Sequence, residues 1–304
     1  MSNKRSATIK NIKKNKVLYI MMIPVLAYFL TFCYAPMFGV IMAFENYKPG
    51  KGIFGSEWVG FQNFIDFFQS YYFWRLLKNT LVISLKDIAL SFPLSILFAL
   101  MLNEVKHQKF KKTVQTISYL PYFISLVVVC GLVKDFTESG GFISNIIASL
   151  GGPQNGILSE PSYFQSIFVW SNVWQNLGYN SIVYISALAA IDPQLYETAR
   201  VDGANRLKQI LYISLPGITP TIIIMLILRV GSIMTVSYQK IILLYGPSTY
   251  ETADVISSFI YRKGLINNDY GYATAVGLFN SLVNLVLIIA TNKLNQKYTE
   301  TSLW

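Results

Sequence analysis

The sequence predicts an all-α polytopic membrane protein with six transmembrane helices, and three observations lead to this prediction. The chain has 304 residues, of which 53% are hydrophobic and only 13% are charged. Its mean hydropathy is positive, so it is too apolar for an ordinary soluble protein of this length. Several apolar runs reach the roughly 20 residues that a helix needs to cross a hydrocarbon core of about 30 Å. Each run is continuously apolar, whereas a strand of a membrane barrel would alternate.

The chain is expected to form one membrane domain over residues 1–304, because it contains no soluble domain, low-complexity linker or clear internal repeat. A basic tail, residues 1–16, precedes the first span. That first run is about twice as long as the apolar region of a signal peptide and lacks a small-residue cleavage site, so we expect it to remain attached. The six spans are expected at about 17–44, 80–102, 114–133, 164–191, 216–239 and 272–292.

Between the first two spans, aromatic residues recur at helical spacing from Phe61 to Trp74 beside polar ones. The spacing predicts a helix at the outer membrane surface. An interfacial aromatic belt explains it, and contact with an extracellular partner is the alternative.

Basic residues are distributed unevenly between the two ends of the spans. The tail and every second loop carry about twice as many lysines and arginines as the opposite loops, which predicts that both termini lie in the cytoplasm. The formal charge of +10 follows this topology, and we therefore expect no nucleic-acid partner.

The sequence gives no sign of a metal, a cofactor or a catalytic centre in this chain. Cys33 and Cys130 lie inside predicted spans, and His107 sits among lysines in a short loop. The phosphate-binding pattern Gly-x-x-x-x-Gly-Lys-Ser/Thr does not occur; the fragment at Gly50 has the wrong spacing. The chain is therefore expected not to be an enzyme and not to hydrolyse ATP itself.

The loop at 192–215, between the fourth and fifth spans, is the most informative segment. Asp192 before Pro193 is typical of a helix start, and Gly203 can end that helix. Asn205 then predicts a second start leading to Pro216. The pattern predicts two short helices at an angle on the inner surface.

This loop resembles the EAA loop of binding-protein-dependent ABC importer permeases. Thr198 replaces the first alanine of that pattern, and Leu207 stands where sugar permeases often carry an aromatic residue; both changes keep a moderate size. The resemblance implies that the loop docks on an ATPase. The matching positions are Glu197, Ala199, Asp202, Gly203, Ala204, Leu215, Pro216 and Pro220.

The resemblance extends over nearly the whole chain. The chain is similar to the maltose-transporter class of sugar permeases at Gly60–Phe64, Tyr119–Tyr122 and Trp174–Gly178. It is similar to the LplB-like members of that class at Asp254–Ile256 and Ser302–Trp304. The resemblance implies the type I importer fold in a bacterial cell membrane and import of a carbohydrate, expected to be an oligosaccharide. It also implies a second homologous permease, two ATPase subunits that carry ATP and Mg, and an extracellular sugar-binding lipoprotein.

Polar residues inside the spans are candidates for the sugar pathway, because unpaired amides are costly in lipid. The amides could reach sugar hydroxyls and the aromatic faces could stack on C–H surfaces. Interhelical hydrogen bonding remains the alternative. At about 100° per residue, we expect Trp170 and Trp174 to adjoin the amide face. The candidates in the fourth span are Asn172, Trp174, Gln175, Asn176, Tyr179 and Asn180.

Charged and further polar residues also fall inside spans. Arg229 is deep enough in the fifth span to be paired or pathway-facing, and Lys86 and Asp87 lie in the second. Weaker pathway candidates are Tyr238, Gln239, Asn280 and Asn284.

Two other function classes remain open from the residues alone. An ion-coupled secondary sugar transporter would need no ATPase, but such folds usually carry more spans or inverted repeats. A membrane-embedded glycan enzyme would need paired intramembrane acids, and the spans contain only Asp87.

Overall fold

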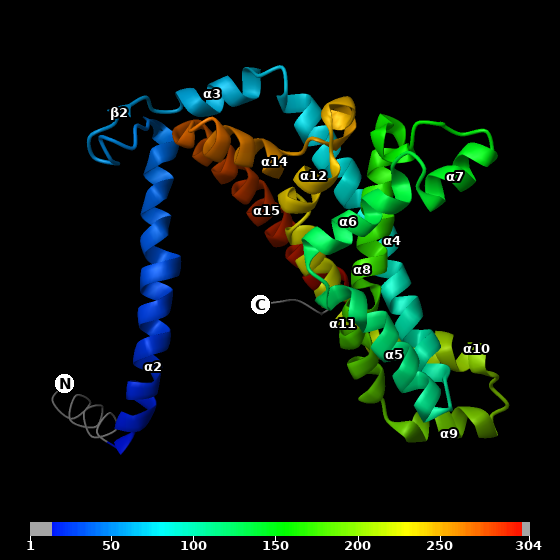
Figure 1. The fold of residues 1–304 in the computed structure, drawn as a ribbon. Helices are drawn as coiled ribbons and strands as arrows, with labels where there is room; N and C mark the ends of the chain where they lie inside the picture. Colours follow the sequence, from blue (N-terminus) through cyan, green and yellow to red (C-terminus); the bar gives the residue numbers. More distant parts are fainter. Residues whose placement is uncertain (1–13, 300–304) are drawn as a thin grey trace.

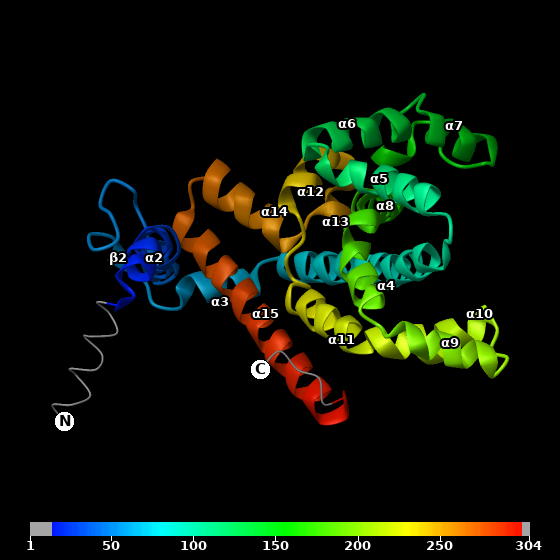
Figure 2. The same cartoon turned by 90° about the horizontal axis from the view of Figure 1, so that it is seen from below.

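The computed structural model describes residues 14–299, apart from the side chains of 298 and 299. Most of the predicted basic tail and the motif Ser302–Trp304 lie outside these residues. Figure 1 shows the helix α2 (Lys16–Tyr28) on one side, a bundle that includes α4, α5, α8 and α11 on the other, and α15 between them. Figure 2, from below, shows α2 end-on and separate from this bundle.

The described chain is mostly helical, with two short antiparallel strands, which confirms the predicted class. The strands are β1 (Glu45–Asn46) and β2 (Glu57–Trp58). Within residues 14–299, four helices are long and apolar enough to cross a membrane, or five if one bent pair counts as a span. The helix α8, 29 residues long, carries the polar candidates and is not among these four. The structure therefore supports a multi-pass membrane protein without fixing the count at six.

The helix bounds follow in chain order. The first span continues from α2 through η1 (Phe29–Tyr34) and η2 (Ala35–Phe44). The middle of the chain forms α3 (Gln62–Gln69), α4 (Phe73–Glu104), α5 (Gln108–Phe123), α6 (Leu126–Thr137), α7 (Phe142–Ser149), η3 (Ile157–Ser159), α8 (Pro161–Ala189), α9 (Pro193–Val201), α10 (Arg206–Gln209), η4 (Ile210–Ser214) and α11 (Leu215–Gly231). The rest forms α12 (Tyr238–Leu244), η5 (Pro247–Thr249), α13 (Tyr250–Ala253), α14 (Ile256–Tyr261), η6 (Arg262–Ile266) and α15 (Tyr270–Thr299).

The predicted third span, 114–133, is wrong as a continuous helix. The chain bends by 99° between α5 and the segment that begins with α6. Ile124 has an extended backbone conformation, and the Ser125 hydroxyl accepts a hydrogen bond from the Val128 amide at 3.4 Å, starting a new helix. A serine cap therefore breaks a run whose hydropathy suggested one helix.

The predicted fifth span, 216–239, also differs from the structure, because α11 ends at Gly231. The freed backbone that follows is held by side chains from neighbouring helices: Ser84 donates to the Ile233 carbonyl at 2.5 Å, and Asn284 accepts from the Met234 amide at 3.1 Å. Such contacts replace the lost helical hydrogen bonds and make non-helical backbone tolerable at this depth. Asn284, a weaker pathway candidate, thus supports backbone.

Three apolar clusters hold the helices together. One joins α4, α6, α8 and α12, and includes Phe164 and Phe168. A second joins α3, α4, α14 and α15 through residues such as Phe67 and Phe259. The third packs α8 against α11 and the C-terminal half of α4, with Tyr184 and Ile218. These clusters fix α4, α8 and α11 relative to one another, and the candidate site lies between these three helices.

Candidate functional site

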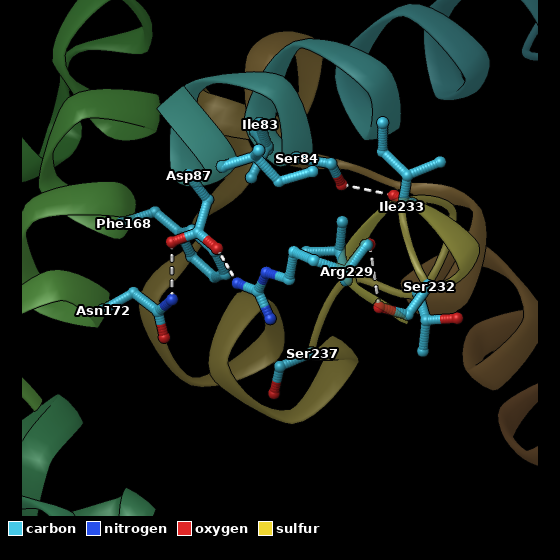
Figure 3. A pocket seen from close by; sticks show the side chains of 12 residues that line it. Ile83, Ser84, Asp87, Phe168, Asn172, Arg229, Ser232, Ile233 and Ser237 are labelled. Carbon is cyan, nitrogen blue, oxygen red and sulfur yellow. Dashed lines mark hydrogen bonds and ion pairs between the residues drawn. The ribbon is translucent and has the colours of Figure 1, made fainter. Parts of the chain in front are cut away.

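A polar cavity of about 150 Å³ lies between α4, α8 and the end of α11. Figure 3 shows the charged pair at its centre: Asp87 of α4 accepts a hydrogen bond from Arg229 of α11 and another from the Asn172 amide of α8, at 2.6 Å. Only 6% of Asp87 is exposed, whereas 42% of the Arg229 side chain is. The cavity is therefore charged, and its accessible charge is the guanidinium.

A second cavity of about 240 Å³ shares Arg229 and Ser232 with the first. It adds Asn180 and Tyr184 from α8 and the hydroxyls of Ser91 and Ser95 from α4. Arg229 thus lies between two cavities, the first mostly polar and the second of mixed character, that follow the same side of α8. This arrangement brings together three of the predicted pathway residues: Asn172, Asn180 and Arg229.

Three other candidates on α8 do not line either of these cavities. Asn176 donates to both the backbone and the side-chain oxygen of Asn172, each at 2.9 Å. Gln175 is buried, and the ring of Tyr179 stacks on Tyr122 of α5 with centroids 3.7 Å apart.

Trp174 does not adjoin the amide face, contrary to the expectation. With Trp170 it lines an almost wholly apolar cavity of about 410 Å³ formed with α6 and α7. At about 100° per residue, two positions along the helix turn Trp174 about 200° away from Asn172. The tryptophans and the amides therefore lie on opposite sides of α8 and cannot form one contiguous surface.

The loop at 192–215 has the two helix starts and the glycine turn that its sequence predicts. The Asp192 carboxylate accepts from the Gln194 amide at 2.9 Å, and the Asn205 side chain accepts from the Lys208 amide at 2.9 Å. Gly203 has a φ of 75°, which favours glycine. Figure 1 shows α9 and α10 together at one end of the molecule, next to the ends of α5 and α11.

The positions that match the EAA loop fall into two groups, one exposed and one that stabilises the loop structure. Glu197, Asp202 and Gly203 are exposed, while the Ala199 carbonyl accepts from the Ala204 amide at 2.8 Å and closes the end of α9. Leu215 and Pro216 form the first turn of α11. Pro216 fits there because the first turn of a helix needs no amide donor.

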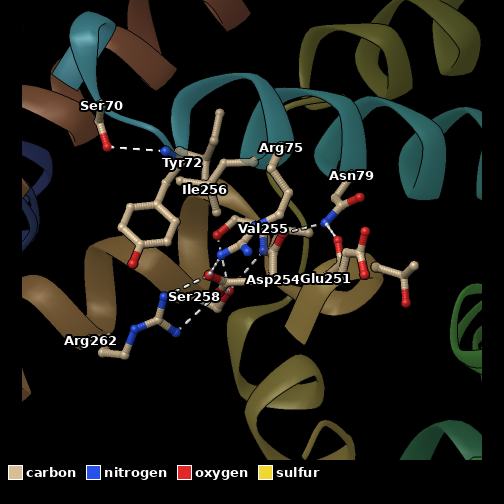
Figure 4. A network of polar contacts seen from close by, with 12 residues as sticks. Ser70, Tyr72, Arg75, Asn79, Glu251, Asp254, Val255, Ile256, Ser258 and Arg262 are labelled. Atoms are coloured by element: carbon tan, nitrogen blue, oxygen red, sulfur yellow. Dashed lines mark hydrogen bonds and ion pairs between the residues drawn. The ribbon is translucent and has the colours of Figure 1, made fainter. Parts of the chain in front are cut away.

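The sequence did not identify the network at the opposite end of the molecule, shown in Figure 4. Asp254 is fully buried and accepts two hydrogen bonds from Arg262, at 2.6 and 3.2 Å. Burial lowers the pKa of the Arg262 guanidinium, but the hydrogen bonds and charge of Asp254 outweigh this effect and raise it. Asn79 of α4 donates to the carbonyls of Asp254 and Glu251. The network holds the segment between α12 and α15 against α4.

Within residues 14–299, no group of three or more His, Cys, Asp or Glu side chains gathers in a way that could hold a metal ion. The cavities beside Arg229, with one charged pair and nearby amides and hydroxyls, are suited to binding a polar solute. Known proteins give this geometry its context. Residues 91–300 match the family described as binding-protein-dependent transport system inner membrane component.

The chain belongs to this family. It is 39% identical over 302 residues to the polygalacturonan/rhamnogalacturonan transport system permease protein YteP of Bacillus subtilis, covering 99% of this chain and 94% of that protein. It is also 39% identical to protein LplB of the same organism, covering 96% and 92%. These relatives extend over the whole permease, including the loop at 192–215.

Solved structures agree with this assignment. A chain of a bacterial ABC transporter involved in the import of the acidic polysaccharide alginate superposes on this permease with a TM-score of 0.88. The two chains are 44% identical, with 96% of this chain and 99% of that one covered. A second structure shows the bacterial alginate transporter with an alginate pentasaccharide-bound periplasmic protein. The expected ABC permease fold is thus confirmed, and the ion-coupled secondary transporter has no support.

Proposed function

We propose that this permease translocates an acidic oligosaccharide, one that contains uronate sugars, into the cytoplasm. The observation that carries the proposal is the half-exposed Arg229, which lies between two cavities that both contain polar side chains. A guanidinium has five N–H donors, and the contact with Asp87 leaves others to face the cavities. A sugar carboxylate can accept from these donors, and the amides of Asn172 and Asn180 can bind hydroxyls.

The names of the relatives support a carboxylated cargo. Alginate is described as acidic in the matching structure, and one relative is named for polygalacturonan and rhamnogalacturonan. Under this proposal, Asn172, Asn180 and Arg229 contact the sugar. Gln175, Asn176 and Tyr179 hold α8 in place, and Trp174 lies outside the route.

We further infer that the chain forms a single six-span domain in the type I importer arrangement and works with a second, homologous permease. The first span supports this inference, because every residue of α2 is exposed in the single chain. A helix that is apolar all round needs lipid or another protein around it. An extracellular sugar-binding lipoprotein would deliver the cargo, as the periplasmic protein of the alginate complex suggests.

Two ATPase subunits would supply the energy, since the sequence has no phosphate loop and ATP and Mg would bind to those partners. The exposed helix α9 would dock on one of them through Glu197, Asp202 and the turn at Gly203. Nucleotide binding would favour one of two arrangements of the membrane helices, which is the coupling that transport requires.

The cargo is tested by measuring uptake in vesicles that contain the complete transporter. We compare a uronate oligosaccharide with a neutral oligosaccharide of the same length. Arg229→Gln should lower uptake of the acidic sugar by about tenfold or more, the loss expected when a charge-assisted contact is removed. Arg229→Lys should retain part of it, and Lys78→Gln, at an exposed lysine, is the control. Transport of the neutral sugar alone by the unmodified protein would refute the proposal.

The topology is tested by thiol labelling of single-cysteine variants from outside intact cells. Both termini and Gly203 are proposed to be cytoplasmic because of the basic residues beside them. A cysteine at Gly203 should remain unlabelled, whereas one at exposed Phe54, on the other side, should react. Efficient external labelling of the Gly203→Cys protein would reverse the proposed orientation.

A further inference from the structure

The coupling helix α9 is attached to the membrane helices through very few side chains. None of its nine residues is buried, and only Tyr196 and Ala199 are partly shielded. The Tyr196 hydroxyl lies 2.9 Å from the hydroxyl of Ser214. Ser214 is fully buried and is the last residue of the π-helical turn η4, immediately before α11. The side chain of Tyr196 thus connects the exposed helix to the start of a membrane helix.

A second contact lies five residues before Tyr196. Ile191, next to the start of α9, packs so closely on Gly217 that a Cβ atom added there would be 2.6 Å from the Ile191 Cδ1 atom. Ser214 and Gly217 lie one turn apart. The two contacts therefore tie α9 and the residue that precedes its cap to the start of α11, Tyr196 by a directional hydrogen bond and Ile191 by packing.

We propose that Tyr196 is a positioning residue that transmits the displacement of α9 to α11 through its hydroxyl contact with Ser214. This inference rests on the proposed role of α9 in docking an ATPase. The helix α11 leads from Ser214 to Arg229, fifteen residues on, or roughly 22 Å at about 1.5 Å per residue. The same rigid element therefore joins the coupling helix at one end to the charged cavity at the other.

The other contacts of the loop do not replace this connection. Gln209 donates to the Ala204 carbonyl at 2.9 Å, and Arg206 pairs with Glu104 at 3.4 Å on the exposed surface. Both fix α10 and the turn after Gly203, not α9. Without the tyrosine hydroxyl, Ser214 can donate to a carbonyl of its own helix, as serines in helices commonly do. Loss of the contact should therefore weaken the transmission of movement from α9 to α11 more than it lowers the stability of the fold.

The test uses the complete reconstituted transporter with its binding protein, and measures sugar uptake and ATP hydrolysis in the same vesicles. Tyr196→Phe keeps the ring and removes only the hydroxyl. We expect sugar taken up per ATP hydrolysed to fall several-fold, while the amount of assembled complex and its melting temperature stay unchanged. Tyr212→Phe is the matched control, because Tyr212 lies in the same turn η4 and is 77% exposed.

Ser214→Ala provides an independent check from the other side of the contact. It should lower the uptake per ATP to the same extent, and the Tyr196→Phe/Ser214→Ala protein should be no worse than either single variant. An unchanged ratio in Tyr196→Phe, or additive losses in the double variant, would overturn the inference. The uptake per ATP can be measured with any sugar that the unmodified transporter takes up, whatever its charge. A neutral cargo would thus refute the proposed substrate and leave this test intact.

Discussion

Asp87 of α4 and Arg229 of α11 form an ion pair between two helices although 142 residues separate them in the sequence. The acid is buried and the base is half-exposed toward two cavities. Asn172 donates to the second oxygen of the same carboxylate. The buried carboxylate of Asp87 therefore positions both the Arg229 guanidinium and the Asn172 amide. Substitutions at Asp87 and Arg229 can distinguish the effect of this pair on stability from its effect on cargo binding.

Asp87→Asn should lower the free energy of unfolding by about 2 kcal/mol, below the 3–5 kcal/mol typical of a fully buried pair because Arg229 is partly solvated. Arg229→Gln leaves the buried carboxylate without its cation and should cost more. The double variant should recover stability relative to Arg229→Gln, yet should not recover uptake of an acidic sugar. Melting temperatures and uptake of the four proteins form the double-mutant cycle. Additive stability losses would show that the pair is not coupled.

The sequence identifies Asp87 and Arg229 as charged residues inside spans, but it does not predict that they form an ion pair with each other. Arg229 is expected from the sequence to be paired or pathway-facing. The structure shows it paired with Asp87 and bordering two cavities, and this contact depends on how α4 and α11 pack. The two helices of the inner loop could be predicted in detail because each cap is made within three residues, as at Asp192 and Asn205. Local chemistry is readable from the sequence; contacts between distant helices are not.

The glycine in the fourth span is required by close packing between α8 and α5. A Cβ atom at Gly178 would lie 2.2 Å from the Ser118 carbonyl oxygen. We predict that Gly178→Ala lowers stability by about 1–3 kcal/mol through overpacking. Gly131→Ala in α6 is the matched control, since nothing lies within 4 Å of its added Cβ atom. The measurement is the melting temperature and yield of each purified complex; equal values for the two variants would argue against this packing.

The buried Asp254 should be the most sensitive residue of the outer network. Asp254→Asn removes the charge that Arg262 pairs with at 2.6 Å, leaving a cation that is only 27% exposed. We expect a loss of about 3 kcal/mol in stability and faster proteolysis within 247–269. Glu251→Gln tests the same segment without this effect, because Asn79 binds the backbone carbonyl of Glu251 and not its carboxylate. Protease resistance equal to that of the control would contradict the role given to Asp254.

The two sides of α8 should respond differently to substitution. Asn172 faces the charged cavity, so Asn172→Ala should lower uptake per assembled complex while costing only about 1 kcal/mol of stability, as for other interhelical hydrogen bonds in membranes. Trp174 lines an apolar cavity with residues such as Trp170 and Ile147. Trp174→Ala removes apolar contacts there, so it should reduce the melting temperature and the amount of complex, with normal uptake by the complex that remains.

The deciding measurement is uptake divided by the amount of assembled complex, taken together with the melting temperature of each variant. Val173→Ala serves as the control for a purely structural loss, since Val173 is only 5% exposed and belongs to the core cluster of α8. Trp174→Ala should behave like this control and unlike Asn172→Ala. The opposite pattern, normal uptake per complex for Asn172→Ala and reduced uptake for Trp174→Ala, would move the sugar route to the apolar side of α8. Arg229 would then serve only to hold α11 against α4.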